Sequence, residues 1–545
     1  MTNSITINQS NSLPLLKYSH FLKGDVSGIQ DFIFTVKSKG ASKSLKARSY
    51  FIQAIADMTI AVITESFGAH NIEVFYNGGG NFYLFCNADV AKLKLIQSEI
   101  QSALKKEDLH LFISLIENKG ITNFGDAWIL INEQSSEDKL LRNQGFLDAF
   151  SPYSKSKYDD SQWKKFTKKL STSTGATIVP SSQTYAVRED KLSFINKSLV
   201  VNTSNNSFDK NIINKLPLWT VPLMNQFDDE TDDEGEIVKK DDIISFGMLA
   251  RFAKARTGTD KIGVLKLDLD NLGTHFRDIN DYDQIKSLSE KLNSFFSNKV
   301  FELWDNQTFT AHKQKTDDHG FLQKDADGNY LKEPYEVPYK DNLYFVFAGG
   351  DDCFVIGAWD AVFEFASRLK SEFDKDIKPI RNITFSAALL LLSPHFPMVQ
   401  LAEEAEECLD EAKGKRPQKD AINVMGEVMD WESFKSTREV VTNLQDLIMF
   451  QNEPKNILHR IMNSQQYFDH LSEKARNGQL SNPKVWRLEY YLARKSRKPK
   501  PQQVVKKIMD DFIKTLLLTA TDRNALNAKK YEIAARWAEL LTRKF

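Results

Sequence analysis

Two stretches of the chain repeat the same order of hydrophobic and polar positions. In each, a strand-like apolar run leads to an aspartate, helical sequence follows, and two β-branched and aromatic runs flank a glycine-rich connection. The first stretch has Asp25 and glycines 78–80, and the second has Asp268 and glycines 349–350. Paired runs around a tight glycine connection are typical of an antiparallel hairpin. The repeat predicts a duplicated α/β unit, with antiparallel strands at the hairpin and helices on one face.

The rest of the chain is organised around these two units. A chain of 545 residues predicts about three to five domains. The region between the units begins with a lysine-rich helical pattern, and the pattern from Trp431 onward is helical with proline interruptions. The sequence therefore predicts an α/β (α+β) protein with a helical linker and a C-terminal helical domain. The predicted domains are 1–150, 151–245, 246–430 and 431–545.

Composition and charge exclude several classes of protein. Lys plus Arg total 72 and Asp plus Glu total 73, so the net charge of −1 gives no overall basic field for nucleic acid. The longest apolar run, Ala387–Leu392, is far too short to cross a bilayer. The polar start of the chain resembles no signal peptide, which favours the cytoplasm. Cys86, Cys353 and Cys408 form no CxxC pair, so we expect neither a disulfide framework nor zinc.

The strongest chemical feature is an acidic pair at the second glycine connection. Asp351 and Asp352 follow Gly349 and Gly350, and Asp268 ends the separate strand. Hard cations such as Mg²⁺ prefer oxygen ligands, and two such ions stabilise the attacking and leaving oxygens of a displacement at phosphorus. The glycines would permit a tight turn and let a nucleotide approach the backbone. Taken alone the pair is equally well a polar turn, and the matched Asp268 strand favours a metal site.

The residues after Asp268 leave a choice open. Alternation along the strand puts Asp268 and Asp270 on the same side, with the Leu269 carbonyl as an additional oxygen ligand. Either Asp270 or Asn271 is expected instead to cap the helix that follows. We therefore assign Asp268 as the metal ligand.

Cationic side chains follow the acidic hairpin. Residues 398–413 form an amphipathic helical pattern that ends in Lys413, and Lys419 lies in the loop before a predicted strand. These cations would neutralise a triphosphate, or Lys413 would simply complement the helix dipole. A second basic cluster, at 494–500, predicts either a phosphate contact or a solvated, partner-binding face.

The first copy has lost part of this chemistry. Asn81 and Phe82 stand where the second copy has Asp351 and Asp352, which predicts a catalytically silent unit. The glycine-containing segment that leads to Ser44 does not match GxxxxGK[ST], so no phosphate loop is expected. A plain helix start explains the segment, with Ser44 as a candidate polar contact to a nucleotide.

These motifs together resemble a known family, the large subunit of type III CRISPR effector complexes in its III-A-like branch. The resemblance covers about residues 18 to 425 and is carried by GDVSGIQDFIF (24–34), YNGGGNFYLF (76–85), VLKLDLDNLG (264–273) and AGGDDCFVIGAWD (348–360). It implies two ferredoxin-like palm domains related to polymerases and nucleotide cyclases. The second palm, with GGDD, is then expected to make cyclic oligoadenylates from ATP when target RNA is bound.

The resemblance also implies site residues, cofactors and partners. Asp268, Asp351 and Asp352 are the implied metal-binding acids, for two Mg²⁺ or Mn²⁺ ions. The implied nucleotide contacts are Gly349, Gly350, Lys413, Lys419, Gly79, Gly80 and Ser44. ATP is the implied substrate, and the implied partners are guide RNA, target RNA and the other subunits of the complex.

Two departures from the family pattern are visible, and two rival functions stay open. The first palm begins within about the first 20 residues, so the HD domain that cuts single-stranded DNA is expected to be missing; the zinc cysteines between the palms are also absent. One rival function is an RNA-binding scaffold without turnover. The other is transfer of AMP to a different small-molecule acceptor.

Overall fold

The structure is a computed structural model that describes most of the chain. The described residues are 17–121, 123–140, 160–171, 173, 175–202, 221–224, 231–232, 235–279, 281–415, 417–463, 477, 486–495, 502–521 and 529–545. Most of the basic cluster at 494–500 lies outside them, so its role stays a prediction. Within the described residues, no helix has both the length and the apolar character that a membrane crossing requires.

Two sheets share the order of their first four strands. The first sheet has the order β2-β3-β1-β4, and the second has β12-β13-β9-β14 followed by β15 and β16. The strands are β1 (His20–Ser27), β2 (Ile72–Gly78), β3 (Asn81–Cys86), β4 (His110–Glu117), β9 (Ile262–Leu269), β12 (Leu343–Gly349), β13 (Asp352–Ala358), β14 (Phe385–Leu392), β15 (Ala421–Val424) and β16 (Glu427–Asp430). In both sheets the first strand lies beside the second strand of an antiparallel hairpin. This is the ferredoxin-like order, and it confirms the predicted α+β class.

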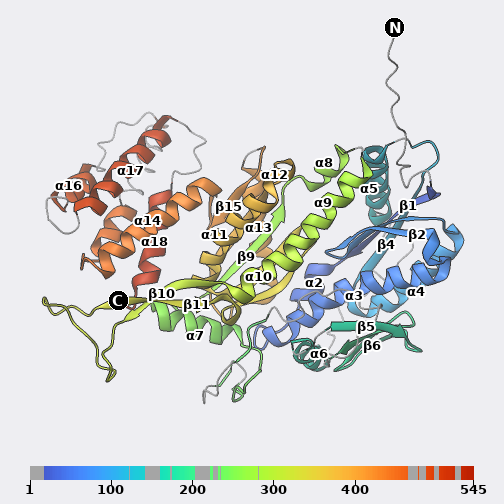
Figure 1. Cartoon of the computed structure of the whole chain (residues 1–545), viewed down its shortest axis with the longest axis horizontal. Helices are drawn as coiled ribbons and strands as arrows, with labels where there is room; N and C mark the ends of the chain where they lie inside the picture. Colours follow the sequence, from blue (N-terminus) through green and yellow to red (C-terminus); the bar gives the residue numbers. More distant parts are fainter. Residues whose placement is uncertain are drawn as a thin grey trace, which may run out of the picture.

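Helices connect and cover these strands. In chain order they are α2 (Ile29–Phe34), α3 (Ser42–Phe67), α4 (Val90–Leu104), α5 (Phe124–Leu140), α6 (Ser161–Ser171), α7 (Phe246–Thr257), α8 (Leu272–Arg277), α9 (Tyr282–Ser294), α10 (Val300–Asn306), α11 (Trp359–Asp376), α12 (Lys378–Arg381), α13 (Met398–Gly414), α14 (Trp431–Met449), α16 (Trp486–Lys495), α17 (Gln502–Thr521) and α18 (Lys530–Thr542). We call β1–β4 with α2–α5 the first palm, and β9 and β12–β16 with α8–α13 the second palm. In Figure 1 the first palm lies at the right, the second palm in the middle, and α14 and α16–α18 at the left.

The linker between the palms differs from the helical prediction. Its described residues contain helix α6 and a four-stranded antiparallel sheet of β5 (Gly175–Pro180), β6 (Tyr185–Val187), β7 (Lys191–Phe194) and β8 (Lys197–Asn202). These strands are short, and short runs carry little periodicity from which to predict them. A separate two-stranded ribbon, β10 (Thr308–Gln314) and β11 (Lys332–Pro338), projects from the second palm (Figure 1).

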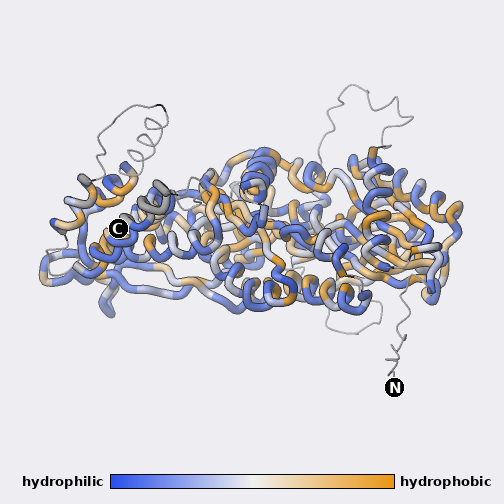
Figure 2. The backbone as a smooth tube through the Cα atoms, turned by 90° about the horizontal axis from the view of Figure 1, so that it is seen from above, coloured by the Kyte–Doolittle hydropathy of each residue, from blue (hydrophilic) through white to orange (hydrophobic). Residues whose placement is uncertain are grey.

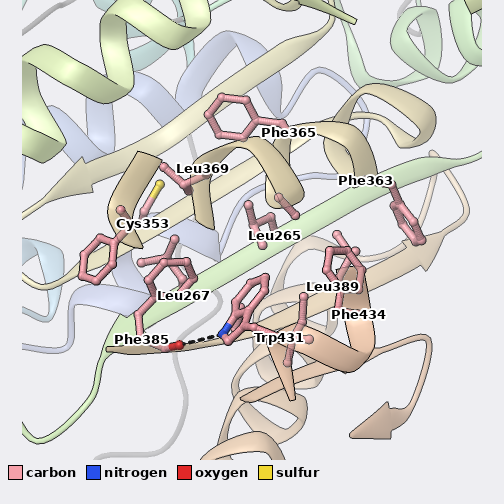
Figure 3. Close-up of a cluster of buried hydrophobic side chains, with 14 of the residues drawn as sticks. Leu265, Leu267, Cys353, Phe363, Phe365, Leu369, Phe385, Leu389, Trp431 and Phe434 are labelled. Atoms are coloured by element: carbon pink, nitrogen blue, oxygen red, sulfur yellow. Dashed lines mark hydrogen bonds between the residues drawn. The ribbon is translucent and has the colours of Figure 1, made fainter. Parts of the chain in front are cut away.

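The strands that carry the candidate site are buried on both faces. On β9, Leu265 and Leu267 pack with Phe385 and Trp431, and the Trp431 indole N–H donates to the Phe385 carbonyl at 3.0 Å (Figure 3). Because side chains alternate along a strand, Asp268 lies on the opposite face, toward α13. Figure 2 shows hydrophobic segments running through the interior of the elongated molecule.

Candidate active site

Strand register brings the three predicted carboxylates together. β9 and β13 pair so that Asp268 lies directly opposite Asp352. The Leu269 N–H donates to the Asp351 carbonyl at 2.9 Å, which ties the hairpin turn to the same strand end. All three acids therefore stand at one end of the second-palm sheet, on elements that are fixed by backbone hydrogen bonds.

Crowding and burial make this cluster electrostatically unfavourable without a cation. Burial, with the nearby Asp268 charge, raises the pKa of Asp351 to about 6. Burial and the Asp351 charge raise the pKa of Asp352 well above its ordinary value. Burial also raises the pKa of Asp268, against the opposing effect of Lys413. Closely spaced carboxylates are the donor type that hard divalent cations prefer, so the residues fit such ions chemically.

The three carboxylates are not arranged as a complete set of metal ligands. Among the described residues, no group of three or more His, Cys, Asp or Glu side chains is arranged to hold a metal ion as it stands. Asp268 instead forms an ion pair with Lys413, with its Oδ2 atom 2.7 Å from the lysine Nζ. The two-ion assignment therefore rests on the chemistry of the donors. The Leu269 carbonyl also stays a predicted ligand.

Lys413 and its helix face the acidic strand. Leu401, Ala405 and Leu409 bury one side of α13 as the sequence pattern predicts. Lys413 lies in the last turn, where it also complements the helix dipole. Its direct contact with Asp268 shows that it belongs to the carboxylate cluster. Nothing in the structure tests its predicted contact with phosphate.

The glycine hairpins of the two palms lie against each other. A Cβ atom on Gly350 would stand 2.7 Å from the Tyr76 hydroxyl and 3.3 Å from the Gly78 carbonyl carbon. A Cβ atom on Gly79 would stand 3.7 Å from an Asp351 carboxylate oxygen. The close approach requires glycine at position 350, which has a φ of 69°. The first palm therefore forms one wall beside the acidic pair.

A cavity of about 120 Å³ lies next to this contact. Gly79, Gly80, Gly349 and Asp352 line it, together with Lys46, Ser49, Tyr50 and Gln53 of α3 and with apolar side chains that include Phe296, Phe345 and Phe347. Ser44 does not line it. The Ser44 side chain is buried, and its hydroxyl donates to the Ala41 carbonyl at 3.3 Å. The geometry thus gives no support to Ser44 as a nucleotide contact, and agrees with the plain helix start.

Sequence reasoning missed Lys46, which enters the cavity from the same helix. Burial lowers the pKa of Lys46 to about 8, and its ammonium donates to the Phe345 carbonyl at 3.3 Å. The signal was present in the sequence, because Lys46, Ser49, Tyr50 and Gln53 share one helical face at spacings of three, one and three. The cavity face of α3 therefore presents polar groups of four residues to the space between the palms.

Asp270 has a structural role that differs from helix capping. Its buried carboxylate accepts hydrogen bonds from the Thr384 and Ser386 hydroxyls, both at 2.8 Å, and from the Asp420 N–H at 2.9 Å. Asn271 occupies the N-cap position of α8 with a φ of 54° and makes no side-chain cap bond. Asn271 thus stands at the predicted cap position without capping the helix through its side chain, and Asp270 instead joins β9 to β14 and to the segment before β15. Lys419 precedes Asp420 in this segment, and its predicted phosphate contact stays untested.

The strand register also corrects the alignment of the two copies. Gly78 pairs with Asn81 across the first hairpin, as Gly349 pairs with Asp352 across the second. Each hairpin has a bulge at the same place, between Val74 and Tyr76 and between Phe345 and Phe347. Gly80 and Asn81, and not Asn81 and Phe82, therefore occupy the positions of Asp351 and Asp352. The first palm still lacks both acids of the pair.

The first palm nevertheless keeps the remainder of the constellation. Asp25 pairs with Asn81 as Asp268 pairs with Asp352. Lys139 of α5 lies 2.7 Å from Asp25, the same contact that Lys413 makes with Asp268.

The second lysine of each palm repeats this symmetry. Lys23 donates to Asn132 of α5 at 3.0 Å, and Lys266 pairs with Glu406 of α13. Asn132 and Glu406 each lie seven residues before the helix lysine. Sequence reasoning missed this equivalence, although both strands contain Lys-x-Asp and both helices repeat the spacing.

Comparison with known proteins gives a consistent result along the chain. The Cas10/Cmr2 second palm domain matches residues 261–423, and Csm1 subunit domain B matches residues 18–151. A curated relative from Methanocaldococcus jannaschii, named CRISPR system single-strand-specific deoxyribonuclease Cas10/Csm1 (subtype III-A), is 26% identical over 75% of this chain and 59% of its own length. The relative of the same name from Enterococcus italicus is 24% identical over 87% of this chain and 61% of its own. The chain thus spans about three fifths of these relatives.

Solved structures share the fold. The crystal structure of a Csm1–Csm4 cassette with pppApA has a TM-score of 0.65 at 19% identity, and covers 97% of this chain and 70% of the matched one. The cassette with cA3 has a TM-score of 0.66 at 18% identity with the same coverage. A further cassette was solved with one ATP, at a TM-score of 0.64 and 19% identity, covering 95% of this chain and 70% of the matched one.

Proposed function

The chain belongs to the Cas10/Csm1 family of type III-A CRISPR large subunits, and from this premise we propose that it joins ATP molecules into cyclic oligoadenylates when target RNA is bound. The observation that carries the proposal is the pairing of Asp268 with Asp352, with Asp351 in the adjoining turn, at the contact between the palms. The ligands named for the similar cassettes support ATP as the substrate.

The roles of the residues follow from their positions. Asp268, Asp351 and Asp352 would hold two Mg²⁺ or Mn²⁺ ions, which supply activation of a 3′-hydroxyl and charge neutralisation at the α-phosphate and the departing pyrophosphate. Lys413, now paired with Asp268, is placed to exchange that carboxylate for a phosphate oxygen. Gly349 leaves the backbone open beside the acids, since a Cβ atom there would meet nothing within 4 Å, whereas Gly350 packs against the first-palm hairpin.

The second nucleotide is proposed to lie against the first palm. Gly79 stands beside the Asp351 carboxylate, and the cavity lined by Gly79, Gly80 and Asp352 contains residues of both palms. A site that holds both reactants replaces a bimolecular encounter with a positioned one, which lowers the entropic part of the barrier. The two palms would therefore act together, with the first palm in a binding role.

We further propose that the protein acts with guide RNA, target RNA and other type III subunits in the cytoplasm. The Csm1–Csm4 assemblies of the structural neighbours support a subunit partner. The near-neutral net charge supports RNA contacts that are local or shared with partners.

Product identification tests the proposal. The complex would be reconstituted with guide RNA and partner subunits, supplied with target RNA, ATP and Mg²⁺ or Mn²⁺, and analysed by mass spectrometry. We expect masses at multiples of AMP minus water, and no product with EDTA in place of the metal. A conjugate mass would instead indicate AMP transfer to another acceptor, and the absence of product from an RNA-loaded complex would favour the scaffold.

A matched pair of variants links the product to the site. Asp351→Ala with Asp352→Ala should abolish the product. Asp317→Ala with Asp318→Ala changes another adjacent acidic pair, in the turn-rich loop between β10 and β11, and should preserve it. Undiminished turnover in the first variant would overturn the assignment of the acids.

A further inference from the structure

The loop between α13 and β15 is tied at both ends to the strand end that carries Asp268. At the start of the loop, the Lys413 ammonium lies 2.7 Å from the Asp268 carboxylate. At its end, the Asp420 N–H donates to the Asp270 carboxylate at 2.9 Å. The described residues between the two contacts include two lysines. Two acids that lie two positions apart therefore hold a positively charged loop next to the acidic cluster.

The end of this loop has an unfavourable backbone conformation. Lys419 and Asp420 have φ values of 57° and 48°, so two consecutive residues with a Cβ atom are left-handed. Residues in this region persist where the surrounding structure fixes them, and they cluster at functional sites. The contacts around Asp420 are therefore the ones that keep the loop in this conformation.

Asp270 supplies the contact to the loop backbone. It is buried, and its own N–H donates to the Thr384 carbonyl at 2.8 Å. Its carboxylate accepts the hydroxyls of Thr384 and Ser386, which give it one orientation. The Asp420 N–H meets the carboxylate in that orientation. Hydrogen bonds to a carboxylate are stronger than those between neutral groups, so this contact is well suited to hold an unfavourable conformation.

The Asp420 side chain is held by lysines of two neighbouring helices. Its carboxylate lies 2.8 Å from the Lys370 ammonium of α11 and 3.4 Å from the Lys378 ammonium of α12. Lys370 is buried, and its ammonium stands 4.9 and 5.3 Å from the ring centroids of Phe385 and Trp431, the two rings that share a hydrogen bond in Figure 3. Asp420 is therefore fixed through both its backbone and its side chain.

The first palm lacks this second tie. Ser27 lies two residues after Asp25, where the second palm has Asp270 two residues after Asp268. Among the strands that the structure describes, the first sheet ends at β4, with no strand in the place of β15. The lysine–aspartate contact of the helix end is common to both palms. The tie through Asp270 thus accompanies the acidic pair rather than the shared fold.

We propose that Asp270 is a positioning residue for nucleotidyl transfer, which fixes the loop so that Lys419 meets the polyphosphate of the ATP bound at the acidic cluster. Lys419 directly precedes Asp420, so the bond from the Asp420 N–H to Asp270 sets where the Lys419 backbone lies. A cation that is already held in place neutralises the charge of the departing pyrophosphate without first having to be ordered. The inference rests on the proposed function, because it takes ATP as the substrate. It gives Asp270 no contact with metal or substrate.

A double-mutant cycle in the reconstituted complex tests whether Asp270 acts through Lys419. Asp270→Asn and Lys419→Met should each lower kcat/KM for ATP by about tenfold, the scale of one lost hydrogen bond to a charged group. The double variant should lose no more than Lys419→Met alone, because no cation is then left for Asp270 to position. Losses that multiply would overturn the proposal, since a purely structural Asp270, or one that acts on Asp268, affects turnover independently of Lys419.

Matched variants separate positioning from folding. Asp360→Asn changes another buried carboxylate of the second palm, which pairs with Arg256 beyond the opposite end of β13. It should lower the melting temperature and keep kcat/KM. Thr384→Val removes a hydroxyl bond to Asp270 and should lower kcat/KM, whereas Thr384→Ser keeps the hydroxyl and should restore turnover. A loss of kcat/KM in Asp360→Asn as large as that in Asp270→Asn would overturn the proposal.

Limited trypsin digestion of the full chain measures the loop without any turnover. Asp270→Asn should speed cleavage after Lys415 and Lys419, because local opening exposes the loop to the protease, and Asp360→Asn should not. Mass spectrometry of the fragments gives the cleavage rates. Unchanged rates in Asp270→Asn would overturn the proposal. Faster cleavage in Asp270→Asn, with no nucleotide product from the wild-type complex, would refute the proposed function and still support the tie, so the two proposals fail separately.

Discussion

The two palms share a frame and differ at the few positions that decide chemistry. Both sheets have the same strand order, the same hairpin bulge, and a lysine–aspartate contact between the first strand and the helix after the fourth strand. Only the second palm has carboxylates at both hairpin positions. Both palms therefore keep the same backbone and the supporting Lys–Asp ion pair. The chemistry differs at the two turn positions, Asp351 and Asp352 against Gly80 and Asn81, and at the position seven residues before the helix lysine, Glu406 against Asn132.

The turns themselves explain why the first palm has no acid pair. Gly79 and Gly80 have φ values of 61° and 80°, so both central residues of the first turn are left-handed, as in a type I′ hairpin. In the second turn Gly350 has a φ of 69°, whereas Asp351 does not have a positive φ. A Cβ atom on Gly80 would also stand 2.7 Å from the Ile29 side chain. The first turn has neither the backbone conformation nor the space for an aspartate.

Exchanging the two strand aspartates for asparagine gives the largest expected contrast. Asp268→Asn removes a proposed metal ligand and should reduce nucleotidyl transfer on the order of 10³-fold, since the transition-state charge loses several kcal/mol of stabilisation. Asp25→Asn changes the equivalent residue of the first palm and should change the maximal rate by less than about tenfold. Pyrophosphate release at saturating ATP measures both. Equal losses would show that the two palms share the chemistry, against the division of roles proposed above.

The glycine contact between the hairpins gives the next largest effect. Gly350→Ala combines a left-handed φ with a contact of 2.7 Å to the Tyr76 hydroxyl. Gly79→Ala meets only ordinary contacts, and Gly328→Ala, at a φ of 85°, meets nothing within 4 Å. The latter two should cost about 1–2 kcal/mol of unfolding free energy from backbone conformation alone, and Gly350→Ala about 1–3 kcal/mol more. Urea denaturation measures all three, and similar values for Gly350→Ala and Gly328→Ala would contradict a close contact between the palms.

The lysines on the first strands give the smallest effect. Lys266→Met leaves the Glu406 carboxylate without its lysine, and should cost about 1–2 kcal/mol, less than a fully buried pair because Glu406 is partly exposed. In Lys23→Met, Asp25 keeps its ion pair with Lys139, and the other partner of Lys23, Asn132, is an uncharged amide. We therefore expect a loss of about 0.5–1 kcal/mol of unfolding free energy. Thermal or urea unfolding of the two variants measures which of them loses more unfolding free energy. A larger cost for Lys23→Met would show that the first-palm cluster serves mainly to stabilise the fold.

Much of the candidate site follows from local sequence. The Gly-Gly-Asp-Asp connection, the Asp268 strand and the Lys413 helix all have strong period-two or helical patterns, and the structure has each element where the pattern predicts it. The linker strands β5–β8 were not predicted, because runs of three to six residues carry too little periodicity. The domain boundaries at 150, 245 and 430 stay predictions.

The sequence by itself determined the duplication, the hairpins and the three candidate acids, because hydrophobic periodicity and turn residues act over a few positions at a time. Only the tertiary structure decided which residues of the two copies correspond, since a register depends on pairing between strands and a slip of one residue is invisible along the chain. It also decided that Asp270 bonds to β14, that Lys46 enters the cavity, and that Lys139 meets Asp25. These contacts join residues far apart in sequence, and the local spacings, although present, do not specify which partner each side chain meets.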